Sequence, residues 1–253
     1  MSFAVSAQAY DRFMGRYSVP LGPLFVDLAR VASGQRALDV GCGPGALTEE
    51  LVARLGAGNV VAVDPSESFV AAARERYPGV EVVEATAEEL PFADDRFDVA
   101  LAQLVVHFMA DPVAGLREMT RVTRPGGIVA AAVWDHRGGG GPLSLFWRVA
   151  RELDASVRDE SDLAGAGEGQ LADLFRQAGV AQVDQTLLTV SVEHATFEEW
   201  WEPFTLGVGP AGAHVAGLDP AGGEELRERC RAAVPAHPFI VSASAWAARG
   251  TVS

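Results

Sequence analysis

The sequence predicts an α/β fold built on a doubly wound, mostly parallel sheet. Between residues 36 and 134, short apolar runs alternate with stretches that have the three- and four-residue spacing of helices. The apolar runs lack the polar alternation of half-exposed strands, which is typical of strands that are covered on both faces. The connections are mostly short and rich in Gly, Pro and Asp, as they are in βαβ units.

Five strands and three helices are predicted in this first part. Ser66 is the expected N-cap of one helix, and Asp111 followed by Pro112 is a strong start signal for another. Pro78 with Gly79, and Gly126 with Gly127, mark turns. The expected strands are 36–40, 59–63, 80–84, 97–102 and 128–134, and the expected helices are 47–55, 66–76 and 111–123.

The second part is less regular. Thr196 and Glu199 form a capping-box pattern that opens a helix with Trp200, Trp201 and Phe204, whose helical spacing favours core packing. Residues rich in Gly predict a mobile loop at 138–142, and residues rich in Gly, Ala and Pro predict a loop at 205–223. Further helices are expected at 144–153, 168–178 and 224–234, and strands at 181–192 and 239–247.

Composition narrows the class of protein. The 253 residues carry a formal charge of −14, which argues against binding nucleic acid or an anionic membrane surface. Cys42 and Cys230 make neither a disulfide framework nor a metal site, so we expect reduced thiols and no metal. No apolar run reaches the length of a membrane span, and no signal peptide is apparent. We therefore expect a cytoplasmic protein, whose oligomeric state the sequence does not predict.

Two signals predict a ligand that contains a ribose. A glycine-rich turn, Gly41-Cys42-Gly43-Pro44-Gly45, follows the first strand, where glycine allows a sharp turn and close approach of a ligand. Asp64 ends the second strand, where an acid can accept hydrogen bonds from both ribose hydroxyls. The pattern fits a nicotinamide cofactor or another adenosine-containing one, and the structural alternative for Asp64 is a helix cap.

Two neighbouring residues favour a ligand with a positive charge. Asp39 lies inside the first strand, two residues before the turn, and a buried acid there suits an ammonium group better than a pyrophosphate. Pro44 removes one backbone N–H that a phosphate would use.

Four motifs in this order resemble the class I S-adenosylmethionine-dependent methyltransferases. They are LDVGCGPG, VVAVDPS, ATAEELPF with FDVALAQLVVHF, and RPGGIVAAAVWD. The resemblance is strongest to the small-molecule branch that includes ubiquinone and menaquinone biosynthesis enzymes. It implies a single domain over 1–253 with seven strands in the order 3-2-1-4-5-7-6, the last one antiparallel. It also implies a cofactor-binding core at 34–135 and a helical lid at about 193–238.

The resemblance also implies roles for individual residues toward S-adenosylmethionine. The glycine turn and Asp39 would lie at the methionine part, Asp64 at the ribose, and Pro65 and Ser66 beside the adenine. Thr86 stands in a segment where the family often has an acid. The implied cofactor-binding residues are Tyr10, Arg16, Asp39, Gly41, Cys42, Gly43, Gly45, Asp64, Pro65, Ser66, Thr86, Ala87, Glu88 and Gln103.

Methyl transfer from a sulfonium is an in-line displacement that needs alignment and exclusion of water more than reactive side chains. A general base is needed only where the acceptor must lose a proton. His107 is the first candidate, with a packed histidine as its alternative, and His136 is the second, with an exposed loop residue as its alternative. The acceptor is expected to be a small molecule, methylated on O, N or C.

Two other functions remain open. An NAD(P)-dependent oxidoreductase needs a hydride-transfer constellation, and none of the three tyrosines, Tyr10, Tyr17 and Tyr77, follows the fourth or fifth strand. A cofactor-binding regulator without catalytic activity is the other alternative.

Overall fold

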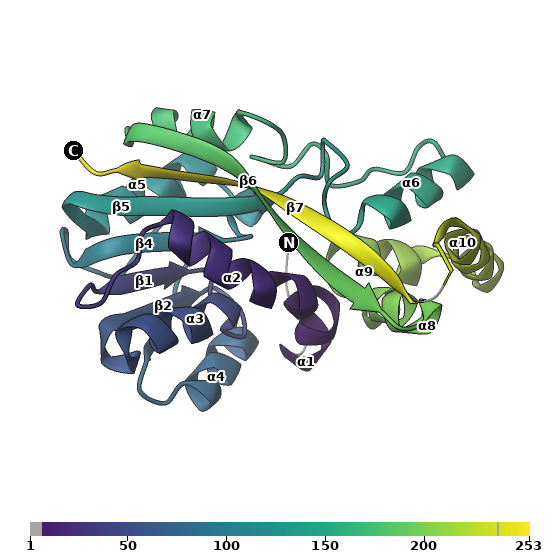
Figure 1. Ribbon diagram of the computed structural model, residues 1–253, viewed down its shortest axis with the longest axis horizontal. Helices are drawn as coiled ribbons and strands as arrows, with labels where there is room; N and C mark the ends of the chain where they lie inside the picture. Colours follow the sequence, from purple (N-terminus) through teal and green to yellow (C-terminus); the bar gives the residue numbers. More distant parts are fainter. Residues whose placement is uncertain (1–6, 237) are drawn as a thin grey trace.

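The computed structural model describes residues 7–236 and 238–253, and it contains one seven-stranded sheet (Figure 1). The strands pair in the order β3-β2-β1-β4-β5-β7-β6, and β7 alone runs antiparallel to its neighbours. This confirms the predicted sheet and strand order. The strands are β1 (Ala37–Val40), β2 (Val60–Asp64), β3 (Glu81–Glu84), β4 (Phe97–Gln103), β5 (Thr123–Trp134), β6 (Ala181–His194) and β7 (Phe239–Thr251).

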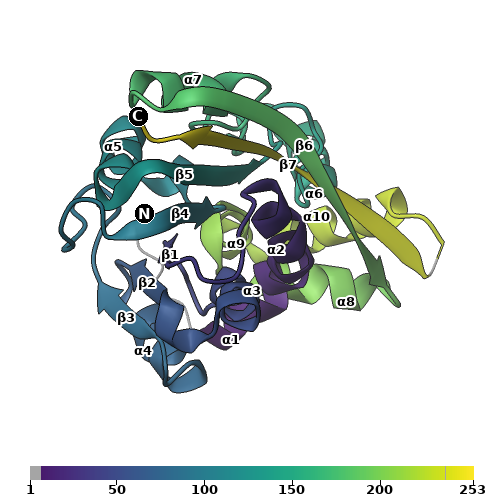
Figure 2. The same ribbon diagram turned by 60° about the vertical axis from the view of Figure 1, so that its left-hand side comes forward.

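Helices cover both faces of the sheet, which is the doubly wound arrangement that the sequence predicts (Figure 2). One face packs against α5 (Pro112–Val122) and α7 (Gln170–Gln177). The other face packs against α2 (Arg16–Leu28), α3 (Ala46–Leu55) and α4 (Glu67–Arg76). The two apolar cores hold the strands in place, and so they fix the loops at the strand ends.

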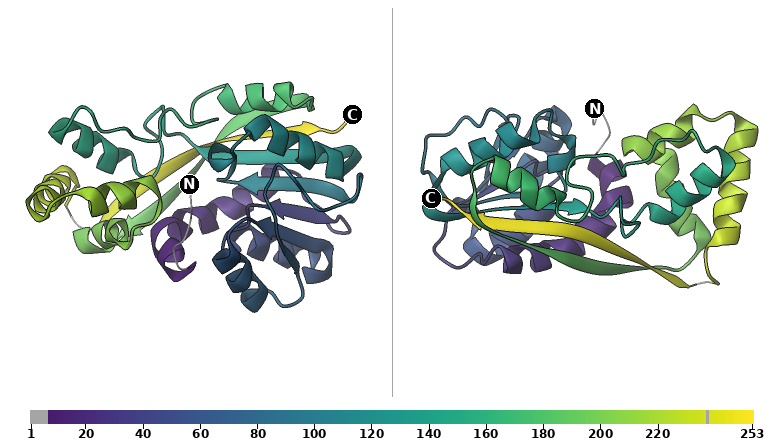
Figure 3. Two further views of the ribbon diagram at one scale, coloured as in Figure 1. Left: turned by 180° about the vertical axis from the view of Figure 1, so that it is seen from behind. Right: turned by 90° about the horizontal axis from the view of Figure 1, so that it is seen from above.

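A helical insertion lies between β6 and β7, which extend past the other strands to carry it (Figures 1 and 3). It packs with α6 (Ser144–Leu153) around its own apolar core, in which the rings of Phe146 and Phe204 stack with centroids 4.5 Å apart. Trp200 and Trp201 are buried there, as core packing predicts. The insertion consists of α8 (Phe197–Trp201), η4 (Glu202–Leu206), α9 (Gly209–Gly217) and α10 (Pro220–Ala233).

Two of the three predicted helix caps have the expected hydrogen bonds. The Asp111 side chain accepts a bond from the Ala114 N–H, and the Thr196 hydroxyl accepts one from the Glu199 N–H. Ser66 occupies the N-cap position of α4, but its side chain makes no cap bond.

The prediction of a loop at 205–223 is wrong, because α9 and the start of α10 occupy it. Glycine and proline lower helix propensity, but Pro210 and Pro220 lie in first turns, where proline is tolerated. Burial of Ala211 and Leu226 in the aromatic core supplies the remaining stabilisation. The glycine run at 138–142, expected to be mobile, forms a turn whose Gly140 and Gly141 N–H groups donate to the Asp135 carbonyl.

The segment before β1 is helical, and α2 contains Pro20 and Pro23 although proline usually interrupts a helix. A helix face packed on the sheet was the alternative interpretation of Phe13, Met14 and Tyr17. Short helical segments complete the fold: α1 (Ala7–Tyr10), η1 (Asp11–Gly15), η2 (Ala57–Asn59) and η3 (Val106–Phe108). In the described part of the chain, no helix has the length and apolar character needed to span a bilayer.

Candidate cofactor and acceptor site

A cavity of about 580 Å³ opens at the carboxyl ends of β1, β2, β3 and β4. Ligands of doubly wound sheets bind at this edge, near the point where strand order reverses. The cavity brings together nine of the residues that the sequence assigned to the cofactor. They are Tyr10, Gly41, Gly43, Asp64, Pro65, Ser66, Thr86, Ala87 and Glu88.

The glycine turn after β1 needs glycine for two physical reasons. Gly41 has φ = +70°, in the left-handed region that side chains disfavour. A Cβ on Gly41 would lie 2.4 Å from Cγ2 of Val105, so no side chain fits between this turn and the loop after β4. Gly43 also has a positive φ, but a Cβ there would meet nothing within 4 Å. The turn thus presents bare backbone to the cavity.

Asp64 is held in place by two backbone donors. Its Oδ2 accepts a bond from the Gly43 N–H and its Oδ1 accepts one from the Ser66 N–H, both at 2.8 Å. Burial raises the pKa of this carboxyl, while the two backbone bonds lower it. A carboxylate offers about four acceptor positions, so each oxygen retains one for a ligand hydroxyl. Asp64 therefore joins two loops and still offers acceptors to the cavity.

Asp39, two residues before the turn, and Cys42, within it, are both buried and do not line the cavity. Asp39 is 1% exposed and accepts a 2.6 Å bond from the Thr48 hydroxyl. Burial raises its pKa to about 7, and Asp64 adds to that increase. Burial also raises the pKa of the Cys42 thiol, which suits a small packing residue and not a nucleophile.

Tyr10 and Glu88 both line the cavity, Tyr10 from the N-terminal segment and Glu88 from the loop after β3. The Tyr10 ring contacts the Phe69 ring edge to face, with centroids 5.3 Å apart. Glu88 Oε1 accepts bonds from the N–H groups of Ala110 and Asp111, so it fixes the loop that leads into α5. The N-terminal segment thus joins the cavity that the strand-end loops form.

Gly45, Arg16 and Gln103 lie outside this cavity, and their contacts with the cofactor stay predictions. A Cβ on Gly45 would lie 2.3 Å from Cε2 of Tyr77. Gln103 Nε2 donates to the Ser18 carbonyl, beneath α2.

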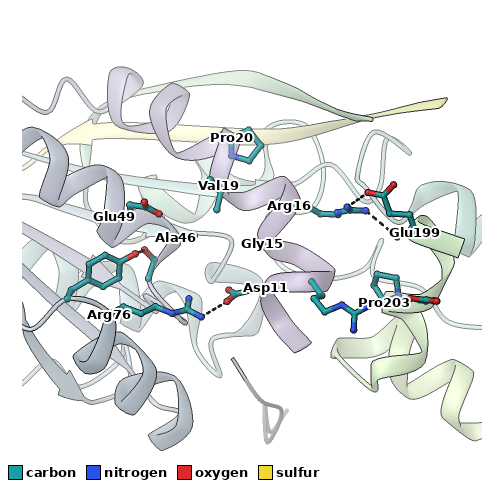
Figure 4. Close-up of a pocket in the computed structure, with 14 residues that line it drawn as sticks. Asp11, Gly15, Arg16, Val19, Pro20, Ala46, Glu49, Arg76, Glu199 and Pro203 are labelled. Carbon is teal, nitrogen blue, oxygen red and sulfur yellow. Dashed lines mark hydrogen bonds and ion pairs between the residues drawn. The ribbon is translucent and has the colours of Figure 1, made fainter. Parts of the chain in front are cut away.

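Gly45 and Arg16 line a second cavity of about 600 Å³ between the sheet domain and the insertion (Figure 4). Arg16 Nη2 donates to Glu199 Oε1 at 2.6 Å, and its Nη1 lies 2.9 Å from His194 Nδ1. Arg76 pairs with Asp11 on the opposite wall. These ion pairs already partner the guanidinium groups, so the second cavity is a weaker candidate than the first for an adenosine ligand.

His107 and His136 both line a small cavity of about 40 Å³ next to the first one. These two adjoining cavities share Tyr10, Leu104 and Phe108. We call the first, of about 580 Å³, the large cavity and the other the small cavity. His107 is buried, and burial together with His136 lowers its pKa well below the ordinary value. The side chain of His136 is 5% exposed, so the expectation of an exposed loop histidine is wrong.

Sequence reasoning did not find Leu104 or Glu160. Leu104 has φ = +65°, a strained conformation for leucine at the boundary between the cavities. Glu160 lines the small cavity from the segment between α6 and α7, where no motif marks it. No group of three or more His, Cys, Asp or Glu within the described residues is arranged to hold a metal ion.

Comparison with known families gives the identity of the fold. Residues 38–131 match the family described as the methyltransferase domain. The match contains the glycine turn, Asp64 and the strand-end loops that form the large cavity. Residues 38–131 therefore carry a methyltransferase domain. Its core has the fold that the four motifs implied.

Curated relatives match a little under two thirds of this chain. An uncharacterized methyltransferase of Mycobacterium tuberculosis is 38% identical over 65% of this chain and 59% of its own length. A ubiquinone biosynthesis O-methyltransferase of Ruegeria pomeroyi is 36% identical over 62% of this chain and 64% of its own. The chain thus spans about three fifths of the length of these curated relatives.

One solved structure has a similar fold over the whole length of this chain. It is a phosphoethanolamine N-methyltransferase of Haemonchus contortus, in complex with phosphomonomethylethanolamine and S-adenosylhomocysteine. It covers 100% of this chain and 61% of its own, with 16% identity and a TM-score of 0.58. This likeness supports the fold alone.

Proposed function

We propose that this protein transfers a methyl group from S-adenosylmethionine to a small-molecule acceptor. The observation that carries the proposal is the position of Asp64, Gly41 and Gly43 around one cavity at the carboxyl edge of the sheet. The methyltransferase domain and the relatives named as methyltransferases support the same reaction.

The residues present fit S-adenosylmethionine on three counts. Asp64 retains an acceptor position on each oxygen for the ribose hydroxyls. Gly41 and Gly43 line the cavity without side chains, which lets a ligand approach the backbone closely. Asp39 is a buried acid that accepts a hydrogen bond from the neutral Thr48 hydroxyl, and the ammonium group of the ligand would complement its charge.

When bound, S-adenosylmethionine supplies a methyl group on a positively charged sulfur. The strand-end loops would hold it with Asp64 and the glycine turn, and Tyr10 and Phe108 would cover it from the side of the small cavity. Those two residues line both cavities and would exclude water from the path of the methyl group. We assign His107 to contact with the acceptor, because it lines the small cavity.

The acceptor is proposed to be a small molecule rather than a nucleic acid. The net charge of −14 opposes approach of a polyanion. The small cavity lies between the sheet and the insertion, so the helical insertion would act as the lid over the acceptor. A cytoplasmic location stays a prediction.

The oxidoreductase alternative has no support from the comparisons. Tyr10 is the one tyrosine that lines the large cavity, and it comes from the N-terminal segment instead of a strand end. Turnover of the cofactor would distinguish an enzyme from a cofactor-binding regulator without catalytic activity.

Calorimetric titration with S-adenosylhomocysteine tests the proposal, with NAD and NADP titrated in parallel. We expect the homocysteine compound alone to bind. The variant Asp64→Ala should weaken its binding by about 10²-fold, because two hydrogen bonds to a charged group are lost. Asp184→Ala is the matched control, since this carboxylate lies on β6 and its side chain is 74% exposed. Binding of NAD instead, or equal affinities for both variants, would overturn the proposal.

A further inference from the structure

Three residues that line the small cavity have a buried ring nitrogen with no hydrogen-bond partner in the described chain. Nδ1 of His107, Nε2 of His136 and Nε1 of Trp134 are buried, and none of them has a hydrogen-bond partner among the described residues. Buried polar atoms in native proteins are nearly always paired, because an unpaired one loses its bonds to water. Three of them around one cavity indicate that a polar group of a ligand belongs there.

Glu160 lies behind His136. Its Oε2 is 4.0 Å from Nδ1 of His136, and both side chains are 5% exposed. The Trp147 indole N–H donates to the same Oε2 at 2.9 Å and holds the carboxyl group in place. Catalytic hydrogen bonds are often long before a ligand binds, so 4.0 Å is within the range from which a histidine–carboxylate pair tightens.

The backbone on both sides keeps these two side chains in position. The Gly138 N–H donates to Oδ1 of Asp135, and a Cβ on Gly141 would lie 3.3 Å from Nδ1 of His136. The glycine run at 138–142 therefore packs closely against the histidine ring. On the other side, Oδ1 of Asp159 accepts bonds from the N–H and hydroxyl of Ser161, which forms a tight turn around Glu160.

The two histidines differ in how well they can hold a proton. Their ring centroids are 5.8 Å apart, so only one of them can be charged without strong repulsion. For His107, burial and His136 both lower the pKa. For His136, burial lowers the pKa to about 4, and Asp159 and Asp135 oppose that decrease. His136 therefore becomes an effective base only when the Glu160 carboxylate, 4.0 Å away, pairs with its imidazolium. Burial also raises the pKa of Glu160 to about 7, so its carboxylate forms near neutral pH.

We propose that the acceptor is an apolar or aromatic molecule with an acidic hydroxyl, and that His136 takes the proton of this hydroxyl. Glu160 is the positioning residue, which pairs with the imidazolium that results, and His107 holds the acceptor. This rests on the proposed methyl transfer. The hydroxyl O–H bond breaks and its proton moves to Nε2 of His136. The oxygen bonds to the methyl carbon as the carbon–sulfur bond breaks, and that electron pair stays on sulfur.

The lining of the cavity supports this class of acceptor. Its apolar walls suit an aromatic ring, and none of its described lining residues is an Arg or Lys that could bind a phosphate or carboxylate. The Trp134 N–H can donate to a second oxygen of the acceptor. The apolar walls are formed by Phe13, Met14, Leu104, Phe108, Trp134, Leu143, Val208 and Pro210.

The test uses the full chain saturated with S-adenosylhomocysteine and titrated with 4-nitrophenol, whose phenol and phenolate forms differ in absorbance. We expect binding, with the apparent pKa of the bound phenol lowered by about one unit, a tenfold shift toward phenolate. 4-Nitroaniline, which has a similar shape but no acidic hydroxyl, should bind without proton transfer. Loss of S-adenosylhomocysteine binding itself would instead be a failure of the proposed methyl transfer.

Three variants separate the roles. His136→Phe keeps a ring and should abolish the phenolate shift, whereas His107→Phe should weaken binding and keep the shift. Glu160→Gln keeps an acceptor for the Trp147 N–H. It should remove most of the roughly tenfold shift toward phenolate, with little change in the affinity for 4-nitrophenol. Glu152→Gln on α6, 61% exposed, is the matched control.

The pH dependence gives a second reading. Glu160 is faced by His136 and Trp147 and lies beside Asp159, and Asp135 and His107 face His136. The measured quantity is the phenolate-to-phenol ratio of bound 4-nitrophenol divided by that of the free compound at the same pH. In the wild type this quotient should increase as pH rises through about 7, and in Glu160→Gln it should be flat. Failure of 4-nitrophenol to bind, an unchanged shift in His136→Phe, or an unchanged pH profile in Glu160→Gln would each overturn the inference.

Discussion

The two cavities that meet at Tyr10, Leu104 and Phe108 satisfy their polar groups in opposite ways. In the large cavity, Asp64 is already bonded to two backbone N–H groups, and Glu88 to two others. In the small cavity, three buried ring nitrogens have no partner among the described residues. The large cavity is preorganised by its own backbone, whereas the small one is completed only by a ligand.

This difference has a consequence for stability. A preorganised cofactor site binds without reordering, because its loops are fixed by bonds within the protein. Unpaired nitrogens lower the stability of the free protein, and a ligand that pairs with them recovers that free energy on binding. Changes to the large cavity should therefore weaken folding and cofactor binding together, whereas removal of an unpaired nitrogen from the small cavity should weaken acceptor binding without destabilising the protein.

The largest effect is expected from Gly41→Ala. The left-handed backbone costs about 1–2 kcal/mol for alanine, and the overlap with Val105 adds about 1–3 kcal/mol. We expect the free energy of unfolding to fall by about 2–5 kcal/mol, and affinity for S-adenosylhomocysteine to fall more than about tenfold. Urea unfolding and calorimetry measure the two changes.

Two control variants divide this effect into its parts. Gly43→Ala carries the left-handed strain but no overlap, because a Cβ there meets nothing within 4 Å. The double variant Gly41→Ala with Val105→Ala removes the overlap and should recover part of the loss. Equal stability of Gly41→Ala and Gly43→Ala would contradict the close packing of the turn against the loop after β4.

The same contrast explains what the sequence predicts. All seven strands were predicted from local patterns. Eight of the nine lining residues lie within a few residues of a strand end, whereas Tyr10 lies in the N-terminal segment and was implied only by the family resemblance. Asp64 ends β2, and the glycine turn follows β1. The carboxyl ends of parallel strands lie at one edge of the sheet, so residues that follow different strands in the sequence lie close together in the structure.

The small cavity has no such local signal. It joins segments around Phe13, His107, His136, Glu160 and Val208, which lie far apart in the chain. The role of Glu160 depends on its contacts with Trp147 and His136. These contacts form only when the insertion and α6 pack together. The helix α9 was missed for a related reason, since burial in the aromatic core outweighs its weak helix propensity.

The next effect is a dependence of stability on pH that comes from Asp39. Its folded pKa of about 7 lies above the usual value near 4, so the folded state holds the proton more tightly than the unfolded state. Stability is therefore lost as pH rises from about 4 through 7, by up to ~4 kcal/mol at 1.36 kcal/mol per unit. Glu160 acts in the same direction.

Thermal unfolding between pH 5.5 and 8 measures this dependence. Asp39→Asn keeps an oxygen for the Thr48 hydroxyl and should flatten the curve, with the variant more stable than the wild type at pH 8. S-adenosylhomocysteine should stabilise the wild type more at pH 8 than at pH 5.5, if its ammonium group lies near Asp39. A steep curve that persists in Asp39→Asn would assign the dependence to other groups.

The smallest effect concerns how an acceptor enters the small cavity. A volume of about 40 Å³ holds a few waters, so Val208 and Pro210 must move for an aromatic ring to enter. Gly207 and Gly209, on either side of Val208, have φ of +71° and +62°, which favours glycine in this conformation.

Gly209→Ala should cost the closed conformation about 1 kcal/mol, because a Cβ there meets nothing and the backbone alone is strained. Binding of 4-nitrophenol to the protein saturated with S-adenosylhomocysteine should strengthen by about fivefold, because opening the cavity then costs less free energy. Gly217→Ala makes the same change at the end of α9, where no positive φ is required, and should leave binding unchanged while stabilising the helix slightly. If both variants change binding equally, the stability of the insertion as a whole, and not the backbone around Val208, controls access to the acceptor cavity.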